Sequence, residues 1–134
     1  MKKSGIWIDR EKAVIITFKG SESEIKRLES QIETRERLEG EGNDSSRFGT
    51  QYINNETHKN NKIEEQTNQF FKKIDAELNQ INEVILFGPA DMKVKLEKHI
   101  RSNNQLSEKL EGVFSTDSMT ENQMVAYVWE YYND

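Results

Sequence analysis

The chain has 134 residues, of which 34% are hydrophobic and 32% are charged, and it contains no cysteine. This length supports one compact core, so we expect a single domain over residues 1–134, and the missing cysteines exclude disulfides and thiolate metal sites. The formal net charge of −5 argues against a basic surface that binds nucleic acid along its whole extent, so any RNA contact is expected to be local.

The N-terminal part of the chain predicts three strands. Residues 6–8 and 13–18 are runs of apolar, β-branched and aromatic residues, and the short polar stretch 9–12 between them is typical of a β-hairpin. Residues 24–33 predict a third strand at a sheet edge, because few of its residues are large and apolar. Their spacing also fits a short helix, but we prefer the strand because a two-stranded hairpin is marginally stable alone.

Residues 34–61 lack hydrophobic periodicity and are rich in glycine, asparagine and serine. This composition predicts a long flexible loop. Loops of this length inside compact domains are usually functional or disordered, so the stretch is the first candidate for a binding surface.

A helix and a buried strand are predicted after this loop. Phe70, Ile74 and Leu78 are spaced to share one face of a helix from about residue 62 to 80, with Asp75 assigned to the opposite, polar face. Residues 84–87 form a continuous apolar run, which is typical of a strand buried on both faces of a parallel sheet.

The next helix is predicted to follow that strand closely. Gly88 and Pro89 end the strand, and Pro89 suits the first turn of a helix, where its missing N–H costs nothing. Leu96 and Ile100 are expected to face inward from this helix.

A short strand and a capped helix complete the chain. Residues 112–114 predict the strand. The final helix is expected to begin with a capping box, formed either by Thr120 with Gln123 or by Ser118 with Glu121. In order, the elements predict a three-layer α/β fold with three helices and a mixed five-stranded sheet, in which an antiparallel meander of three strands precedes two parallel strands.

Three stretches carry a resemblance to a known family. They are Gly-Ile-Trp-Ile-Asp at residues 5–9, Phe-Gly-Pro-Ala at residues 87–90, and the capped helix at residues 120–127. Together they resemble small bacterial proteins related to the central domain of archaeal and eukaryotic peptide-chain release factors. The resemblance implies a ribonuclease H-like fold of the translational-machinery group.

The catalytic tip of that family is missing from this sequence. In release factors, the loop before the long helix carries a Gly-Gly-Gln motif that enters the peptidyl transferase centre. The corresponding residues 44–51 are Asp-Ser-Ser-Arg-Phe-Gly-Thr-Gln, and a backbone path that depends on two residues without Cβ is not reproduced by one glycine. We therefore expect a non-catalytic, translation-linked or ribosome-associated binding protein, with no catalytic residues and no enzyme activity.

The predicted loop contains the candidate RNA-binding residues. Arginine and lysine pair with phosphate, and an aromatic ring stacks on an unpaired base. The candidates are Arg35, Arg37, Arg47, Phe48, Gln51 and Lys59. Acidic residues outnumber basic ones in and beside this stretch, so a solvated loop without a ligand is the competing interpretation.

Two further sites near the strand ends were considered. Residues 88–90 with Lys93 resemble an anion cradle at a helix start, but helix capping is favoured because Asp91 would repel an anion. Asp9, Asp91 and Asp117 suggest a metal-dependent nuclease as a less favoured alternative, because Asp9 begins a polar turn and suits turn formation better.

No cofactor and no metal are expected. His58 and His99 are too few for a zinc site without carboxylate help, and no nucleophile motif accompanies them. The chain shows neither a signal-peptide-like stretch nor a candidate membrane span, so we expect a cytoplasmic protein without membrane partners.

An alternative function is a protein-interaction or self-associating module that does not bind RNA. The aromatic residues from Trp129 to Tyr132 exceed what one helix face buries, and residues 24–33 predict an exposed edge strand. A homo-oligomer or a protein partner would use these two surfaces.

Overall fold

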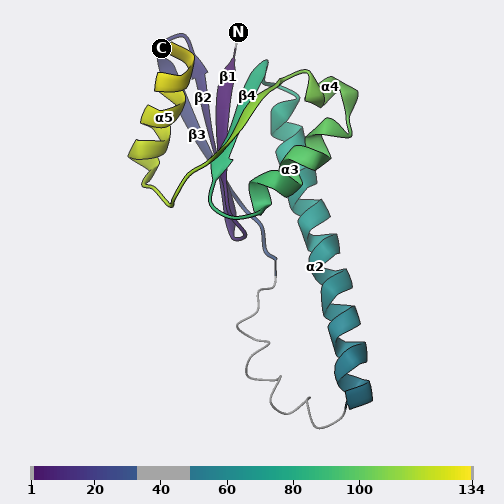
Figure 1. Cartoon of the computed structure of the whole chain (residues 1–134). Helices are drawn as coiled ribbons and strands as arrows, with labels where there is room; N and C mark the ends of the chain where they lie inside the picture. The colour runs from purple at the N-terminus through teal and green to yellow at the C-terminus, as the bar shows by residue number, and fades with distance from the viewer. Residues whose placement is uncertain (1, 33–48, 134) are drawn as a thin grey trace.

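The structure, a computed structural model, describes residues 2–32 and 49–133, and for residues 49–61 it describes the backbone alone. Five strands form one sheet in the order β3-β2-β1-β4-β5 (Figure 1). The strands are β1 (Lys3–Ile8), β2 (Lys12–Lys19), β3 (Glu22–Glu29), β4 (Glu83–Gly88) and β5 (Leu110–Ser115).

The strand pairing confirms the predicted mixed sheet. β1 with β2 and β2 with β3 pair antiparallel, whereas β1 with β4 and β4 with β5 pair parallel. The third strand is an edge strand, as preferred over a helix, although it starts and ends earlier than predicted.

Helices cover both faces of the sheet, so the predicted three layers are present. The helices are α2 (Gly49–Leu78), α3 (Met92–Arg101), α4 (Asn104–Ser107) and α5 (Glu121–Asn133). One turn of helix, α4, was not predicted. Its N-cap Asn103 accepts hydrogen bonds from the backbone N–H groups of Gln105 and Leu106. The helix is too short to show an apolar periodicity in the sequence.

Alternate residues of the central strands belong to two separate hydrophobic cores, one on each face of the sheet. Ile6 and Leu86 pack with α2 and α3, whereas Trp7 and Phe87 pack with α5 on the other face. All four side chains are buried, because a strand covered on both faces exposes neither set of its alternating residues. This explains the continuous apolar run that identified β4.

The long helix α2 corrects the predicted loop. Residues 49–61, which were assigned to a flexible loop over 34–61, form the first half of α2, and the helix starts at Gly49 instead of near residue 62. Figure 1 shows this half running past the ends of the strands. A helix has an apolar stripe in its sequence where it packs against a core. A helix segment that projects away from the sheet therefore has no such stripe.

The last helix packs on the sheet at unusually short range. A Cβ atom at Gly5 would lie 2.4 Å from Val128 Cγ2, so α5 approaches β1 only because residue 5 lacks a side chain. The helix begins with the predicted box of Thr120 and Gln123, in which each residue's backbone N–H donates to the other's side-chain oxygen at 2.9 and 3.2 Å. Glu121 instead pairs with Arg27 of β3, and this ion pair lowers the pKa of Glu121.

Candidate functional site

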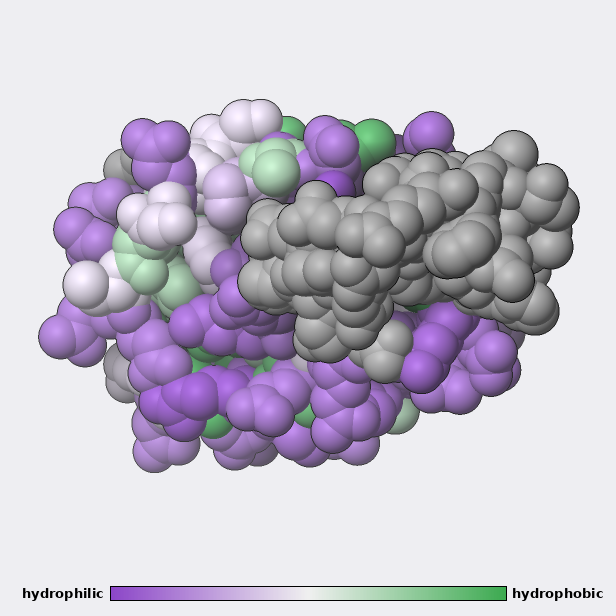
Figure 2. Space-filling model, turned by 90° about the horizontal axis from the view of Figure 1, so that it is seen from below, coloured by the Kyte–Doolittle hydropathy of each residue, from purple (hydrophilic) through white to green (hydrophobic). Residues whose placement is uncertain are grey.

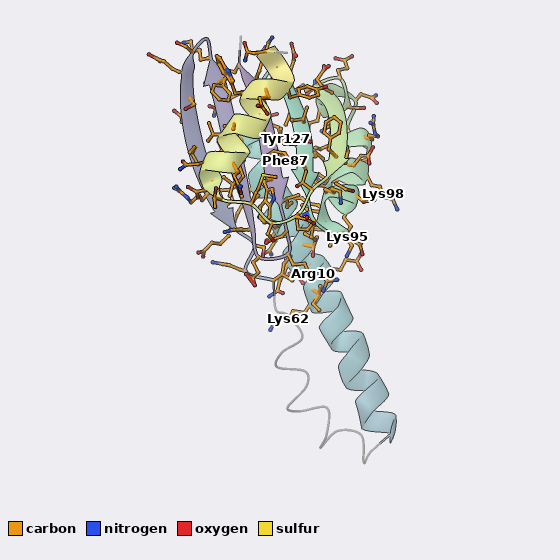
Figure 3. The ribbon with its side chains drawn as sticks, turned by 60° about the vertical axis from the view of Figure 1, so that its left-hand side comes forward. Arg10, Lys62, Phe87, Lys95, Lys98 and Tyr127 are labelled. Atoms are coloured by element: carbon orange, nitrogen blue, oxygen red, sulfur yellow. The ribbon has the colours of Figure 1, made fainter. Side chains whose placement is uncertain are left out.

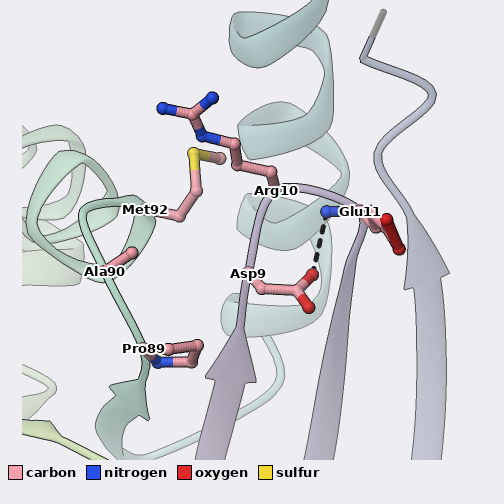
Figure 4. A pocket seen from close by; sticks show the side chains of 6 residues that line it. All are labelled: Asp9, Arg10, Glu11, Pro89, Ala90 and Met92. Atoms are coloured by element: carbon pink, nitrogen blue, oxygen red, sulfur yellow. Dashed lines mark hydrogen bonds between the residues drawn. The ribbon is translucent and has the colours of Figure 1, made fainter. Parts of the chain in front are cut away.

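The carboxyl ends of the three parallel strands lie at the end of the sheet from which α2 projects (Figure 1). Ligands of open α/β sheets bind at this end of the strands. Two open hollows lie here, of about 240 and 330 Å³, on either side of the turn that contains Pro89 and Ala90. Figure 4 shows the first, which is lined by Asp9, Arg10, Glu11, Pro89, Ala90 and Met92. The second is lined by Pro89, Ala90, Ser115, Thr116 and Asp117.

The turn between the hollows has a constrained backbone. Gly88 has φ +143°, and a Cβ atom there would lie 2.5 Å from the carbonyl oxygen of Ile8. Ala90 has φ 58°, in the left-handed region that costs a residue with a side chain about 1 kcal/mol or more. The prediction that Pro89 lies in the first turn of α3 is wrong. The helix starts at Met92, and Asp91 is its N-cap.

Lys93 holds this turn in place. Its side chain folds back so that Nζ donates to Ala90 O at 2.6 Å, and the residue is only 5% exposed. The Lys93 ammonium group therefore donates to a backbone carbonyl. It is not directed at the anion site that residues 88–90 could form. The favoured alternative was helix capping: Asp91 is the N-cap of α3, but its side chain forms no capping hydrogen bond.

Asp9 forms a turn, as favoured over a catalytic role. Its Oδ1 accepts hydrogen bonds from the backbone N–H groups of Glu11 and Lys12 at 2.8 and 2.9 Å. Among the described residues, no group of three or more histidine or acidic side chains is placed to hold a metal ion. Asp9, Asp91 and Asp117 are therefore not gathered into the carboxylate cluster that the nuclease alternative requires.

A row of basic side chains passes the first hollow. Figure 3 shows Lys98 and Lys95 of α3, Arg10 of the β1–β2 turn and Lys62 of α2 following one another along the molecule. Arg10 shares its hollow with Met92, the first residue of α3, and Lys95 and Lys98 follow on that helix. All four side chains are exposed, and within the described part of the chain Arg10, Lys95 and Lys98 form no ion pair. We call Arg10, Lys95 and Lys98 the basic row.

The structure describes none of the predicted RNA-binding side chains. Arg35, Arg37, Arg47 and Phe48 lie outside the described residues. Gln51 and Lys59 lie on the projecting half of α2, where the backbone is helical and the side chains are not described. The basic row was not predicted, because its members come from two segments 85 or more residues apart, and only the pairing of β1 with β4 brings them together.

A histidine and an aspartate connect α2 to α3 above this end. His99 Nε2 and Asp75 Oδ2 are 2.8 Å apart, and the His99 ring lies 5.2 Å from that of Phe71. Asp75 is thus not on the solvated face to which the sequence assigned it; it is half-buried, and its Oδ1 is buried without a hydrogen-bond partner. The pair fixes the orientation of the helix that carries the projecting half.

Aromatic side chains gather on the opposite face of the sheet, around α5. Tyr127 stacks on Phe87 with ring centroids 4.5 Å apart, and Tyr131 lies 5.6 Å from Phe114 of β5. Burial raises the pKa of Tyr127 and of Tyr132. Trp129 and Tyr131 remain 39% and 38% exposed, so the prediction that one helix face does not bury this cluster is confirmed.

The end of the molecule below the strands has a predominantly hydrophilic described surface (Figure 2). A polar surface of this kind suits a polar partner better than an apolar one. No helix in the described ranges 2–32 and 49–133 has the length and apolar character needed to cross a membrane.

Comparison with known proteins supports the fold. No family model and no curated protein matches the sequence. Among solved structures, the archaeal translation termination factor aRF1 superposes with a TM-score of 0.52 at 20% identity, over 98% of this chain and 39% of that one. A structure described as an archaeal protein gives a TM-score of 0.48 at 19% identity, over 93% of this chain and 32% of that one. The chain thus has a release-factor-like fold and spans about two fifths of the termination factor's length.

Proposed function

We propose that this protein is a non-catalytic, translation-linked binding protein that contacts ribosomal RNA through the projecting half of α2 and the segment before it. The fold shared with part of a translation termination factor supports the setting. The observation that carries the proposal is the projection of α2 itself.

The helix is much longer than the domain needs. Its 30 residues span about 45 Å, whereas strands of six to eight residues span roughly 20–26 Å. Phe70 is its first buried residue among those with described side chains, and Phe71, Ile74 and Leu78 provide the remaining buried contacts. Among its described side chains, the buried ones of α2 therefore begin at Phe70, in the half that lies against the sheet.

The basic row supplies a described surface for phosphate at the base of this projection. Arg10, Lys95 and Lys98 are exposed and have no acidic partner within the described residues. Lysine and arginine in this state bind phosphate by replacing its counterions, which makes binding dependent on salt. RNA would then contact the basic row at one place and the predicted candidates between Arg35 and Lys59 at another.

The absence of catalysis is part of the proposal. The glycine pair that positions the release-factor tip is missing from residues 44–51. Asp9, at the end of β1, accepts hydrogen bonds from the backbone of its own turn. Within the described part of the chain, no three acidic or histidine side chains come together to hold a metal ion. Binding without a chemical step is therefore the function that this geometry supports best.

Co-sedimentation with ribosomes and with separated subunits, at low and moderate salt, tests the proposal. We compare the wild type with the triple variant R10E/K95E/K98E, with R35E/R37E/R47E, and with the control K19E/K72E/K73E, which changes the net charge equally at other exposed lysines. The first two variants should pellet less. The slope of log affinity against log salt should fall by about 2 for loss of three phosphate contacts.

Two results would overturn the proposal. One is a wild-type protein that does not pellet at either salt concentration. The other is equal loss in the control, which would mean that net charge alone governs the association. Circular dichroism spectra of all variants establish that each is folded before the comparison.

A further inference from the structure

The sheet has two edges, and they differ in how they are protected. β3 carries five charged residues among its eight, and two of them are tied to helices: Lys26 pairs with Glu77 of α2, and Arg27 pairs with Glu121 of α5. Charged side chains on an edge strand prevent pairing with another chain. We therefore expect this edge, whose outer side is also unpaired within the described residues, to resist strand addition, and we call it the closed edge. The prediction that residues 24–33 bind a partner stays a prediction.

The edge at β5 has no such protection. Its six residues include one charged residue, Glu111, and within the part that the structure describes no strand pairs with its outer side. The N–H of Thr116 donates inward to Gly88 O at 3.0 Å. Because backbone groups alternate along a strand, the N–H and C=O groups of Val113 and Ser115 point outward.

The side chains beside this edge are aromatic on one face. Phe114 lies over Gly112, where a Cβ atom would come within 2.8 Å of its ring, so the ring lies along the strand. Tyr131 lies 5.6 Å from Phe114 and Tyr127 lies 6.4 Å from it. Phe114 is half-buried and Tyr131 is exposed, so the apolar surface continues to the edge.

Carboxylates lie at the start of the same edge. Glu111 of β5 and Glu83 of β4 are close enough to Tyr132 to contribute, after burial, to the rise in its pKa. Neither carboxylate forms an ion pair within the described residues. Lys3 Nζ already lies 5.6 Å from the centroid of the Tyr132 ring. The groups at the edge itself that attract an ammonium or guanidinium group are therefore Glu111 and the rings of Phe114 and Tyr131.

We propose that the outer edge of β5 binds an extended segment of a partner protein, in which lysine or arginine flanks apolar residues, as a sixth strand. Main-chain hydrogen bonds to Val113 and Ser115 would hold the segment, its apolar residues would cover Phe114 and Tyr131, and a basic residue would pair with Glu111. This mode is strand addition, in which the edge gives affinity and the alternate side chains give specificity.

Charge selects this occupant over a second copy of the chain. Two copies would bring two Glu111 carboxylates to one short edge, with no basic residue in β5 to compensate either. Each copy also carries a formal charge of −5. Association of two copies brings like net charges together, whereas a basic segment does not.

Fluorescence anisotropy with a labelled nine-residue peptide that has lysine at both ends and alternates valine and threonine between them tests the inference. We expect saturable binding by the full chain. A peptide with glutamate in place of lysine should not bind, and a peptide N-methylated at every residue should lose binding because it has no N–H to donate along either edge. Amide hydrogen exchange should slow at Val113 and Ser115 in the presence of the first peptide.

Variants locate the site on the molecule. E111K and Y131A should each weaken binding roughly fivefold to tenfold. The matched control is E24K, which makes the same charge change on the closed β3 edge and should bind like the wild type. Equal binding of the N-methylated peptide, equal loss in E24K, or slowed exchange at β3 instead of β5 would overturn the inference. No ribosome is present, so the result is independent of the proposed RNA contact.

Discussion

His99 of α3 and Asp75 of α2 are joined by a hydrogen bond of 2.8 Å between Nε2 and Oδ2, near the C-terminal end of the long helix, where α2 packs on the core. The two residues are 24 positions apart in the sequence and belong to different helices. Because α2 carries the projecting half, this contact couples the orientation of that half to the rest of the core.

Removing His99 should destabilise the domain. We expect H99A to lower the free energy of unfolding by about 1–3 kcal/mol, because it leaves the half-buried Asp75 carboxylate without its partner. The double variant H99A/D75A should lose less than the sum of the two single variants, measured by urea unfolding. R101A, which breaks the exposed pair with Glu97, is the control and should cost no more than about 0.5 kcal/mol. Strict additivity would show that the two side chains are not coupled.

Gly88 should tolerate no side chain. G88A places a Cβ atom 2.5 Å from Ile8 O, a backbone atom that moves only with β1, at a φ of +143°. We expect a loss of at least about 3 kcal/mol in urea unfolding. Gly20 is the matched control: its φ is +67° but nothing lies within 4 Å of a Cβ there, so G20A should cost about 1–2 kcal/mol. Equal costs at the two positions would mean that the approach to Ile8 is not tight.

Gly5 and Val128 should behave as a coupled pair. G5A forces a Cβ atom against Val128 Cγ2, so α5 must move away from β1, and we expect a cost of about 1–3 kcal/mol. V128A alone should also destabilise, because Val128 is buried. The double variant should be more stable than the sum of the two predicts, since removal of Cγ2 provides the space. A sum that is simply additive would contradict the close contact.

Tyr132 should make stability depend on alkaline pH. Burial, with the nearby charges of Glu83 and Glu111, raises its pKa above the ordinary value of about 10. The stabilisation from neutral Tyr132 is therefore complete below about pH 10 and is lost as the pH rises towards the folded-state pKa.

The comparison with Y132F isolates this effect. Near pH 8 the variant should be less stable by about 1 kcal/mol, because it lacks the hydrogen bond that the Tyr132 hydroxyl donates to Ser4 O. The gap should narrow between pH 8 and pH 10.5 in urea unfolding, while titrating lysines affect both proteins alike. A gap that stays constant with pH would show that Tyr132 has the same pKa in the folded and unfolded chains.

Local patterns in the chain were sufficient for most of the fold. The turn at residues 9–12, the apolar run of β4 and the Thr120–Gln123 box each rest on neighbouring residues, and the structure confirms all three. The alternation of apolar residues in strands and their periodicity in helices indicate which side chains pack against a core. The five strands and the packed part of α2 were therefore predictable. The absence of a Gly-Gly-Gln motif is also visible directly in the sequence.

Contacts between distant segments decided the remaining features. The first half of α2 is helical without an apolar stripe, because it does not pack on the sheet. Asp75 meets His99, and the basic row assembles, only because β4 inserts beside β1 and places α3 next to both the β1–β2 turn and α2. The difference between the β3 edge and the β5 edge has the same origin, since Glu77 of α2 and Glu121 of α5 form ion pairs with β3, whereas within the described residues no ion pair joins a helix to β5. Short-range patterns fix which residues must be buried, whereas the packing of whole elements determines which exposed residues come together.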